Sequence, residues 1–344
     1  MGIFDWLKGK KNRSHKSYYK NGQLKEEFNL EGDKLEGSFK TYYENGQLQE
    51  ESIYEDDKRN GLLKIYYENG QLKEESTYEG DKANGLVKIY LKSGTLDLEG
   101  NCKDGKKNGL FKIYYENGQI EQEAYWKDDK KNGLLKIYYE NGQLKEESTY
   151  EGDKVNGLLK VYYENGQIEQ EVNWKDGKKN GLCKNYYENG QLKYEINAKD
   201  GEINGKCKKY YESGELEFEN NYVNDEKNGI EILYHKNGQI SKEWNYVNDK
   251  LEGSFKTYYE NVQLNEDGFL KNSEFYGLSK FYSEGGQLIE ESYWKNNVRH
   301  GEMKTYYENG QLEFEGNMNK GEEIGLWKKC NEDGEIEEIN YDSV

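Results

Sequence analysis

The sequence predicts an all-β protein: an elongated, single-layer antiparallel β-sheet built from tandem 24-residue β-hairpins. Three observations support this fold class. An aromatic residue recurs every 24 residues, an Asn-Gly pair follows it in most repeats, and Pro is absent from all 344 residues. Asn-Gly between two β-rich runs is a strong short hairpin signal, and a chain without Pro suits uninterrupted hydrogen-bonded ladders.

The period defines fourteen repeats over residues 18–344, with residues 1–17 preceding them. No residue is inserted or lost between markers, and residues 65–86 and 137–158 differ at a single position. Such copies indicate one duplicated structural unit that contacts its neighbours only, with two strands each and twenty-eight strands in all. The markers are Tyr18, Tyr42, Tyr66, Tyr90, Tyr114, Tyr138, Tyr162, Tyr186, Tyr210, Tyr234, Tyr258, Tyr282, Tyr306 and Cys330.

The third repeat shows how each hairpin is expected to form. Residues 61–67 and 71–78 are the two strands, with Asn69-Gly70 between them. A two-residue type I′ loop there would place Tyr67 opposite Leu72. A Gly begins the first strand of every repeat from Gly37 to Gly325, which indicates a left-handed backbone at the strand entry.

The same register places Lys64 opposite Glu75. Lys occupies the first position in thirteen of fourteen repeats, with Ile232 as the exception, and an acid occupies the second in thirteen. We therefore expect a column of cross-strand ion pairs, such as Lys64–Glu75 and Lys136–Glu147, each contributing about 0.2–1 kcal/mol.

Side-chain alternation divides the repeat into two faces. One is mostly apolar, and the other is a wet face with a Tyr–Lys–Glu pattern. The apolar face carries Leu63, Ile65, Tyr67, Leu72 and Tyr78, and the wet face carries Leu62, Lys64, Tyr66, Lys73, Glu75 and Thr77.

Composition excludes several classes of protein. Four Cys are too few for a secreted disulfide scaffold, and no run approaches the roughly 18 apolar residues of a membrane-spanning helix. A net charge of −18 argues against nucleic acid as a partner, because phosphate binding requires a basic surface. Mixed charges with 33 Tyr and 39 Gly do not fit a disordered chain.

The phrase GLLKIYYENGQLKEESTYEGDK, at residues 61–82, resembles the MORN repeat family in its bacterial second variant. The resemblance covers nearly all of residues 18–344. Chains of this type are grouped as YwqK-like antitoxins, so the resemblance implies a non-enzymatic, cytoplasmic bacterial scaffold that binds a protein. Its partner would be a toxin, which the chain would neutralise as an antitoxin or immunity protein. Eukaryotic members of the family are associated with membrane tethering and with organising other proteins.

Rows of Tyr are the first candidate binding surface, because Tyr is large, stiff and amphipathic. The alternative is that Tyr covers the faces of a thin sheet, where its β-propensity is high. The candidate partner-binding residues are Tyr66, Tyr90, Tyr114, Tyr138, Tyr162 and Tyr186.

The amino-terminal segment, residues 1–17, is basic, with a formal charge of +4. Phe4 and Trp6, followed by Lys10 and Lys11, would suit weak contact with an anionic membrane, and a membrane-tethered structural scaffold is the alternative function. The segment could instead cap the edge of the first hairpin, or be disordered.

Catalytic and metal-binding patterns are missing from the sequence, so we expect no enzyme activity and no cofactor. The three His are scattered and lie far from any Cys. Cys183 and Cys207 share one repeat position, which puts them two strands apart, about 9.6 Å. That distance exceeds disulfide reach, so both are expected to be reduced, buried thiols.

One repeat breaks the turn pattern. Residues 249–261 copy residues 33–45, yet Val262 follows where Gly46 follows in the first copy. A β-branched residue disfavours positive φ. We therefore expect a different or wider turn and an irregularity over residues 262–272, caused by a bend, a partner's insertion or neutral drift.

Overall fold

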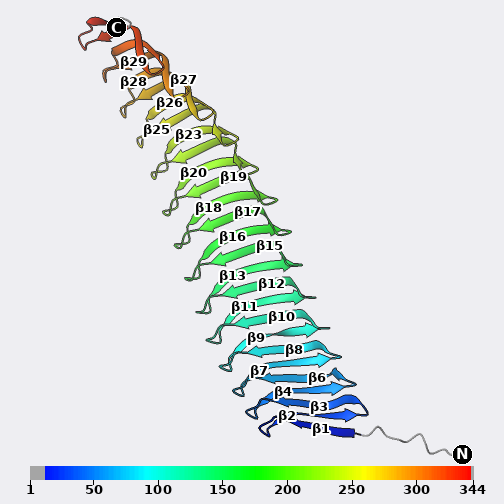
Figure 1. Ribbon diagram of the computed structural model, residues 1–344. Coiled ribbons are helices and arrows are strands. Elements are labelled where there is room, and N and C mark those ends of the chain that lie inside the picture. The colour runs from blue at the N-terminus through cyan, green and yellow to red at the C-terminus, as the bar shows by residue number, and fades with distance from the viewer. Residues whose placement is uncertain (1–11, 342–344) are drawn as a thin grey trace, which may run out of the picture. The chain divides into compact units, whose positions relative to one another are not determined.

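The computed structural model describes residues 12–341. These residues form an open antiparallel β-sheet of 32 strands in successive hairpins, with no helix among them (Figure 1). The all-β hairpin fold expected from the sequence is confirmed. Because the described part of the chain has no helix, it holds none long and apolar enough to cross a membrane.

The strands belong to two compact bodies. The N-terminal body comprises described residues 12–167 and 174–177. Its strands are β1 (Asn12–Tyr18), β2 (Leu24–Glu31), β3 (Lys34–Tyr42), β4 (Leu48–Glu55), β5 (Lys58–Arg59), β6 (Gly61–Tyr66), β7 (Leu72–Glu79), β8 (Lys82–Tyr90), β9 (Leu96–Lys103), β10 (Lys106–Tyr114), β11 (Ile120–Lys127), β12 (Lys130–Tyr138), β13 (Leu144–Glu151), β14 (Lys154–Val155) and β15 (Gly157–Tyr162).

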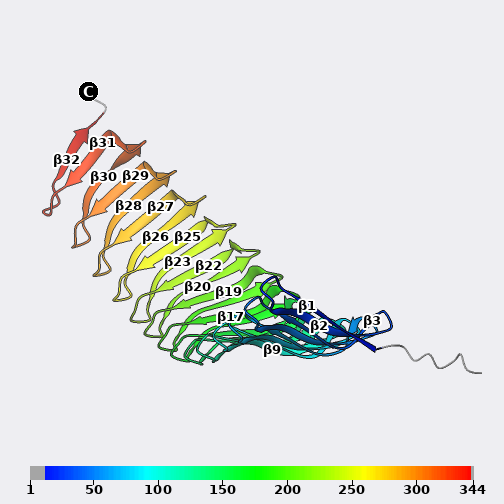
Figure 2. The same ribbon diagram turned by 60° about the horizontal axis from the view of Figure 1, so that its bottom comes forward.

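The C-terminal body comprises residues 168–173 and described residues 178–341, so that most of β16 (Ile168–Lys175) belongs to it. Figure 2 gives a second view of its hairpins. Its other strands are β17 (Lys178–Tyr186), β18 (Leu192–Lys199), β19 (Glu202–Tyr210), β20 (Leu216–Val223), β21 (Glu226–Lys227), β22 (Gly229–Tyr234), β23 (Ile240–Val247), β24 (Lys250–Leu251), β25 (Gly253–Tyr258), β26 (Leu264–Lys271), β27 (Glu274–Tyr282), β28 (Leu288–Lys295), β29 (Val298–Tyr306), β30 (Leu312–Asn319), β31 (Glu322–Cys330) and β32 (Ile336–Asn340).

The number 32 arises because four of the expected first strands are interrupted just before their Gly. In the third repeat the interruption falls at Asn60, between β5 and β6, and Gly61 follows with φ 123°. A Cβ on Gly61 would also lie 3.3 Å from Ile53 Cβ on the preceding strand. Gly is therefore required here both by backbone conformation and by close approach.

The hairpin register is confirmed along most of each strand but not at the turn. Lys64 is opposite Glu75, while Tyr66, not Tyr67, is opposite Leu72, because the register shifts by one residue between Ile65 and Tyr66. The expected Tyr67–Leu72 pairing is wrong for this reason. The returning strand carries one extra residue, which is the definition of a β-bulge.

The turn itself is a three-residue loop rather than the expected two-residue one. The Gly70 N–H donates to the Tyr67 carbonyl over 2.8 Å, and the Tyr67 N–H donates to the Gln71 carbonyl over 2.8 Å. Gly70 has φ 84°, while Asn69 is not among the described residues with positive φ. Asn69 instead accepts the Gln71 N–H on its side chain and donates to the Lys92 carbonyl of the next turn.

Val262 adopts this same turn, so the expected different or wider turn is wrong. Its φ is 64°, and its N–H donates to the Tyr259 carbonyl over 3.0 Å. The Tyr259 N–H donates to the Gln263 carbonyl over 2.9 Å. The two hydrogen bonds and the side-chain cap from Asn261 to the Gln263 N–H hold the valine in a left-handed backbone. β26 follows at its usual place in the repeat.

The hydrophobic core lies on one face of the sheet, where large and small side chains alternate between neighbouring strands. Leu63, 2% exposed, is opposite Ser76, 1% exposed. Phe111 is opposite Gly100, where an added Cβ would lie only 2.3 Å from the ring. Each large side chain therefore fills space that its small neighbour leaves free.

Candidate protein-binding face

The opposite face of the sheet carries the Lys–Glu column, and we call it the ionic face. Its positions are the equivalents of Leu62, Lys64, Tyr66, Glu75 and Thr77 in each repeat. Among the described residues, no second layer covers this face. It is therefore directly accessible to a binding partner.

The lysines and acids of this column lie directly opposite one another. Lys136 Nζ is 3.6 Å from Glu147 Oε2. Lys64 and Glu75 are opposite in the register, but no ion pair within 4.0 Å joins them in the described structure. These pairs are partly exposed, so each contributes little to stability. Further pairs are Lys16–Glu27, Lys40–Glu51, Lys112–Glu123, Lys208–Glu219, Lys280–Glu291 and Lys304–Glu315.

Three of the six candidate Tyr residues connect neighbouring repeats on this face. Tyr114 Oη donates to Glu99 over 2.7 Å, Tyr138 to Glu123 over 2.9 Å and Tyr186 to Glu171 over 2.9 Å. Burial, followed by these carboxylates, raises the pKa of each of the three phenols to about 12. All six candidates, including Tyr66, Tyr90 and Tyr162, are half-buried. The hydrogen bonds of Tyr114, Tyr138 and Tyr186 are structural contacts between repeats, and contact of the six residues with a partner stays a prediction.

The second Tyr of each pair forms another connection, which sequence reasoning missed. Tyr67 Oη donates to the Tyr90 carbonyl over 2.9 Å, and Tyr115 Oη donates to the Tyr138 carbonyl over 2.7 Å. At the one place where His235 replaces the Tyr, its Nε2 lies 3.0 Å from the Tyr258 carbonyl. The doubled Tyr in the repeated phrase was the available signal.

A row of exposed apolar side chains runs beside the ion pairs, at the positions of Leu62 and Thr77. We call it the apolar row. Its members are 39% to 58% exposed. Sequence reasoning placed these positions on the wet face without identifying them as a surface of their own. In the N-terminal body they are Ile53, Leu62, Leu86, Tyr125 and Leu158, and in the C-terminal body Ile230, Phe269, Tyr293 and Leu326.

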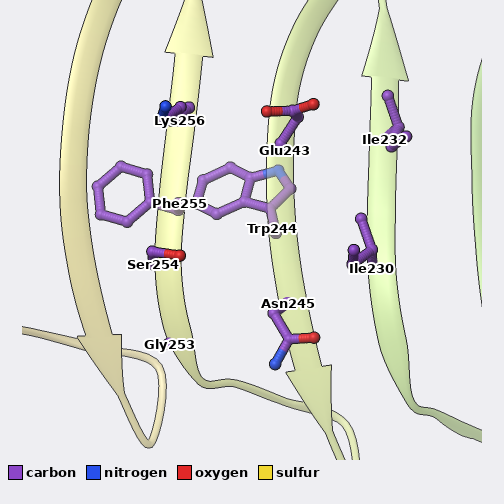
Figure 3. A pocket seen from close by; sticks show the side chains of 9 residues that line it. All are labelled: Ile230, Ile232, Glu243, Trp244, Asn245, Gly253, Ser254, Phe255 and Lys256. Carbon is purple, nitrogen blue, oxygen red and sulfur yellow. The ribbon is translucent and has the colours of Figure 1, made fainter.

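Hollows lie between the apolar row and the ion pairs. In the N-terminal body, a hollow of about 320 Å³ is lined by Ile53, Leu62 and Lys64 among others. In the C-terminal body, another has a volume of about 450 Å³ and includes Ile230 and Ile232 in its lining (Figure 3). Their common position makes the ionic face the candidate functional surface.

The remaining predictions concern metal ligands, the cysteines and the amino-terminal segment. Among residues 12–341, no group of three or more His, Cys, Asp or Glu could hold a metal ion. Cys183 and Cys207 are free and buried on either side of Ile196, as expected, and burial raises the pKa of both thiols. Phe4, Trp6, Lys10 and Lys11 lie outside the described residues.

A family model described as MORN repeat variant matches eleven segments of the chain. The repeat that contains Val262 is not among them. The matched segments are residues 14–31, 35–56, 59–79, 107–128, 131–151, 155–176, 179–200, 203–224, 227–248, 275–296 and 299–320.

Two further comparisons give no functional information. No curated protein matches the chain. Solved structures of TcdB2-TccC3 and of TcdB2-TccC3-Cdc42 match at 15% and 14% identity, each with a TM-score of 0.19. The match covers 95% of this chain and 18% and 17% of those chains, so this chain spans under a fifth of their length. Nothing about its fold or function follows from matches at this TM-score.

Proposed function

The chain belongs to the MORN repeat variant family, and on that premise we propose that this repeat scaffold binds another protein through its ionic face. The observation that carries the proposal is the apolar row. Aliphatic and aromatic side chains 39% to 58% exposed, set beside matched charges, combine the apolar centre and polar surround of a protein interface.

Charge favours a protein over a membrane as the partner. The chain carries a net charge of −18, which opposes association with anionic lipid. A basic protein would instead be steered toward the acidic scaffold. We extend the proposal to the partner's class: a toxin that the chain neutralises by covering it, as the resemblance to antitoxin chains implies.

Affinity capture from a lysate of the source cells, read by quantitative mass spectrometry, tests this proposal. Leu86→Lys with Leu158→Lys places two charges in the apolar row, and should lower the recovered partner about tenfold or more. Val223→Lys with Val247→Lys is the matched control, since both valines are exposed but lie at strand ends outside the row. Equal recovery with both pairs would contradict the proposal.

The membrane-tethered scaffold is separated by liposome flotation. Vesicles containing phosphatidylserine are mixed with the full chain and with a chain lacking residues 1–17. Flotation that depends on residues 1–17 would favour the tethered scaffold, and its absence together with protein capture would favour the protein-binding one.

A further inference from the structure

Strand β22 inverts the polarity of the repeat at two consecutive residues, Glu231 and Ile232. Ile230 lies in the apolar row, Glu231 occupies the core position of Leu63, and Ile232 replaces the lysine of the ion-pair column. Glu231 is 6% exposed, and Ile230 is 58% exposed. An acid is thus buried where the repeat places apolar side chains, and an apolar side chain lies where the repeat places a cation.

On the core face this change has internal compensation. Lys227 Nζ donates to Glu231 Oε1 over 2.6 Å, and Asn220 Nδ2 donates to the same oxygen over 2.9 Å. A buried carboxylate requires such partners. The inversion is therefore accommodated within the fold on that side.

On the ionic face the change leaves a deficit of one positive charge. Ile232 lies between Glu219 on β20 and Glu243 on β23. The other thirteen repeats have a lysine at this position. Lys208 Nζ lies 3.8 Å from Glu219 Oε2, and the Tyr234 hydroxyl donates a hydrogen bond to the same carboxylate. The Tyr258 hydroxyl donates to Glu243 over 3.1 Å. Lys256, opposite Glu243, is exposed. The two acids are about 9.6 Å apart by strand spacing, so one cation between them would interact with both.

Hollows lie on both sides of β22 at this point. The hollow of about 450 Å³ extends from Ile230 and Ile232 over β23 and β25, where exposed Ser254 replaces the usual leucine (Figure 3). A second hollow, of about 150 Å³, lies toward β20 and shares Ile230 and Ile232 in its lining. Ile230 and Ile232 give both hollows an apolar floor. The rim carries Glu243 and Lys256 in the larger hollow, and Glu219 and Lys206 in the smaller one.

We propose that this hollow docks a protein segment in which an aliphatic side chain is flanked by a lysine or arginine. The aliphatic side chain covers Ile230 and Ile232, and the cation takes the place of the missing lysine between Glu219 and Glu243. This assignment rests on the proposed function and names the partner's anchor. An anionic lipid headgroup would meet two carboxylates instead, so a membrane is the disfavoured occupant.

The test uses the full chain and the fluorescein-labelled peptide Lys-Leu-Lys-Leu-Lys, followed by fluorescence anisotropy. Ile232→Lys restores the lysine of the other thirteen repeats, so the variant is expected to fold, and circular dichroism checks this. It should weaken peptide binding about tenfold or more, because it fills the hollow and supplies the missing charge. Val298→Lys is the matched control: it makes the same change of charge at an exposed valine that begins β29, outside the apolar row and outside both hollows, and should alter the affinity less than about twofold.

A second peptide, Glu-Leu-Glu-Leu-Glu, tests the charge requirement and should bind at least about tenfold more weakly. Equal affinity of the two peptides, unchanged affinity in Ile232→Lys, an equal loss in Val298→Lys, or no saturable binding of the basic peptide would each overturn the assignment. Suppose that peptide binding depends on Ile232, but that Leu86→Lys with Leu158→Lys leaves the amount of captured partner unchanged. That result would reject the proposed function and keep the peptide anchor. The reverse pattern would reject only the anchor.

Discussion

At the scale of single residues, Val262 holds a backbone conformation that the repeat otherwise gives to Gly. Its φ is 64° and its side chain is 52% exposed, so no packing compensates for the conformation. The turn is retained because the backbone hydrogen bonds at Tyr259 and the cap from Asn261 are worth more than the strain. The strain is therefore stored locally and can be measured.

Val262→Gly should stabilise the protein by about 1 kcal/mol, because Gly adopts positive φ without a Cβ clash. Urea unfolding followed by circular dichroism measures the change. The reciprocal variant Gly46→Val, in the earlier copy of the same sequence, should destabilise by a similar amount. A null result for Val262→Gly would mean that no strain is stored at this turn.

A second residue-scale feature is Glu266 on the core face. Its Oε1 is buried without a hydrogen-bond partner, as is Oγ1 of Thr257 directly opposite. Burial raises the pKa of Glu266 to about 7, Lys242 opposes this rise, and Glu290 adds to it. The folded state therefore favours the neutral carboxyl, while the unfolded chain ionises near pH 4.5.

A carboxyl whose folded pKa is raised contributes stability that is present below the unfolded pKa and is lost as pH rises through the folded value. The wild-type protein should lose stability between about pH 4.5 and 7 from this group. Glu266→Gln should remove that loss, so that its urea midpoint relative to wild type is higher at pH 8 than at pH 5. Lys242→Gln should extend the loss to higher pH, because it removes a charge that lowers the folded-state pKa of Glu266. Parallel pH profiles for wild type and Glu266→Gln would refute the assignment.

At the scale of strands and hairpins, stability depends on volume matched between neighbouring strands. Gly100 lies between Val87 and Phe111, whereas Ser76 lies between Leu63 and Val87. The smaller residue accompanies the larger neighbour. Core residues differ in size from repeat to repeat, and the fold is kept because a larger residue on one strand is matched by a smaller residue on the next.

Gly100→Ser should destabilise by about 1–3 kcal/mol, since the added Cβ would lie 2.3 Å from the Phe111 ring. Adding Phe111→Leu should recover most of this loss, because it recreates the leucine–serine pairing of Leu63 and Ser76. A double-mutant cycle by urea unfolding gives the coupling free energy. Strict additivity of the two changes would show that the two sites do not share one packing volume.

Sequence periodicity predicted the hairpins and the Lys–Glu register because both depend on repeated, short-range chemistry. It failed at the turn: Asn69-Gly70 signals a two-residue loop, but the Asn69 side chain caps Gln71 and only Gly70 takes positive φ. The hollow at Ile232 was also missed, although the broken lysine column was visible. A hollow forms where short side chains from different strands lie near one another. The short side chain of Ser254 lies on a different strand from Ile232, so the pattern within one strand does not reveal the hollow.

At the scale of the whole molecule, each described strand within a body pairs only with the strands next to it in the order of the repeats. In the N-terminal body, β7 pairs with β6 and β8, and the Tyr67 hydroxyl reaches only as far as the next repeat. Stability then approximates a sum of repeat and nearest-neighbour contributions, as in other repeat proteins. The number of repeats can therefore change without loss of the fold.

Excision of residues 66–89, one full period, should leave a folded, shorter protein. The deletion joins Ile65 to Tyr90, so the outgoing strand of the third repeat continues into the turn of the fourth with the face alternation intact. Far-ultraviolet circular dichroism should keep its β-sheet signal per residue, with only a modest fall in urea midpoint. Excision of residues 66–77 is the control: half a period joins Ile65 to Tyr78 and removes the turn, so local pairing should be lost. Unfolding of the full-period variant would mean that distant repeats support one another, which nearest-neighbour contacts alone do not allow.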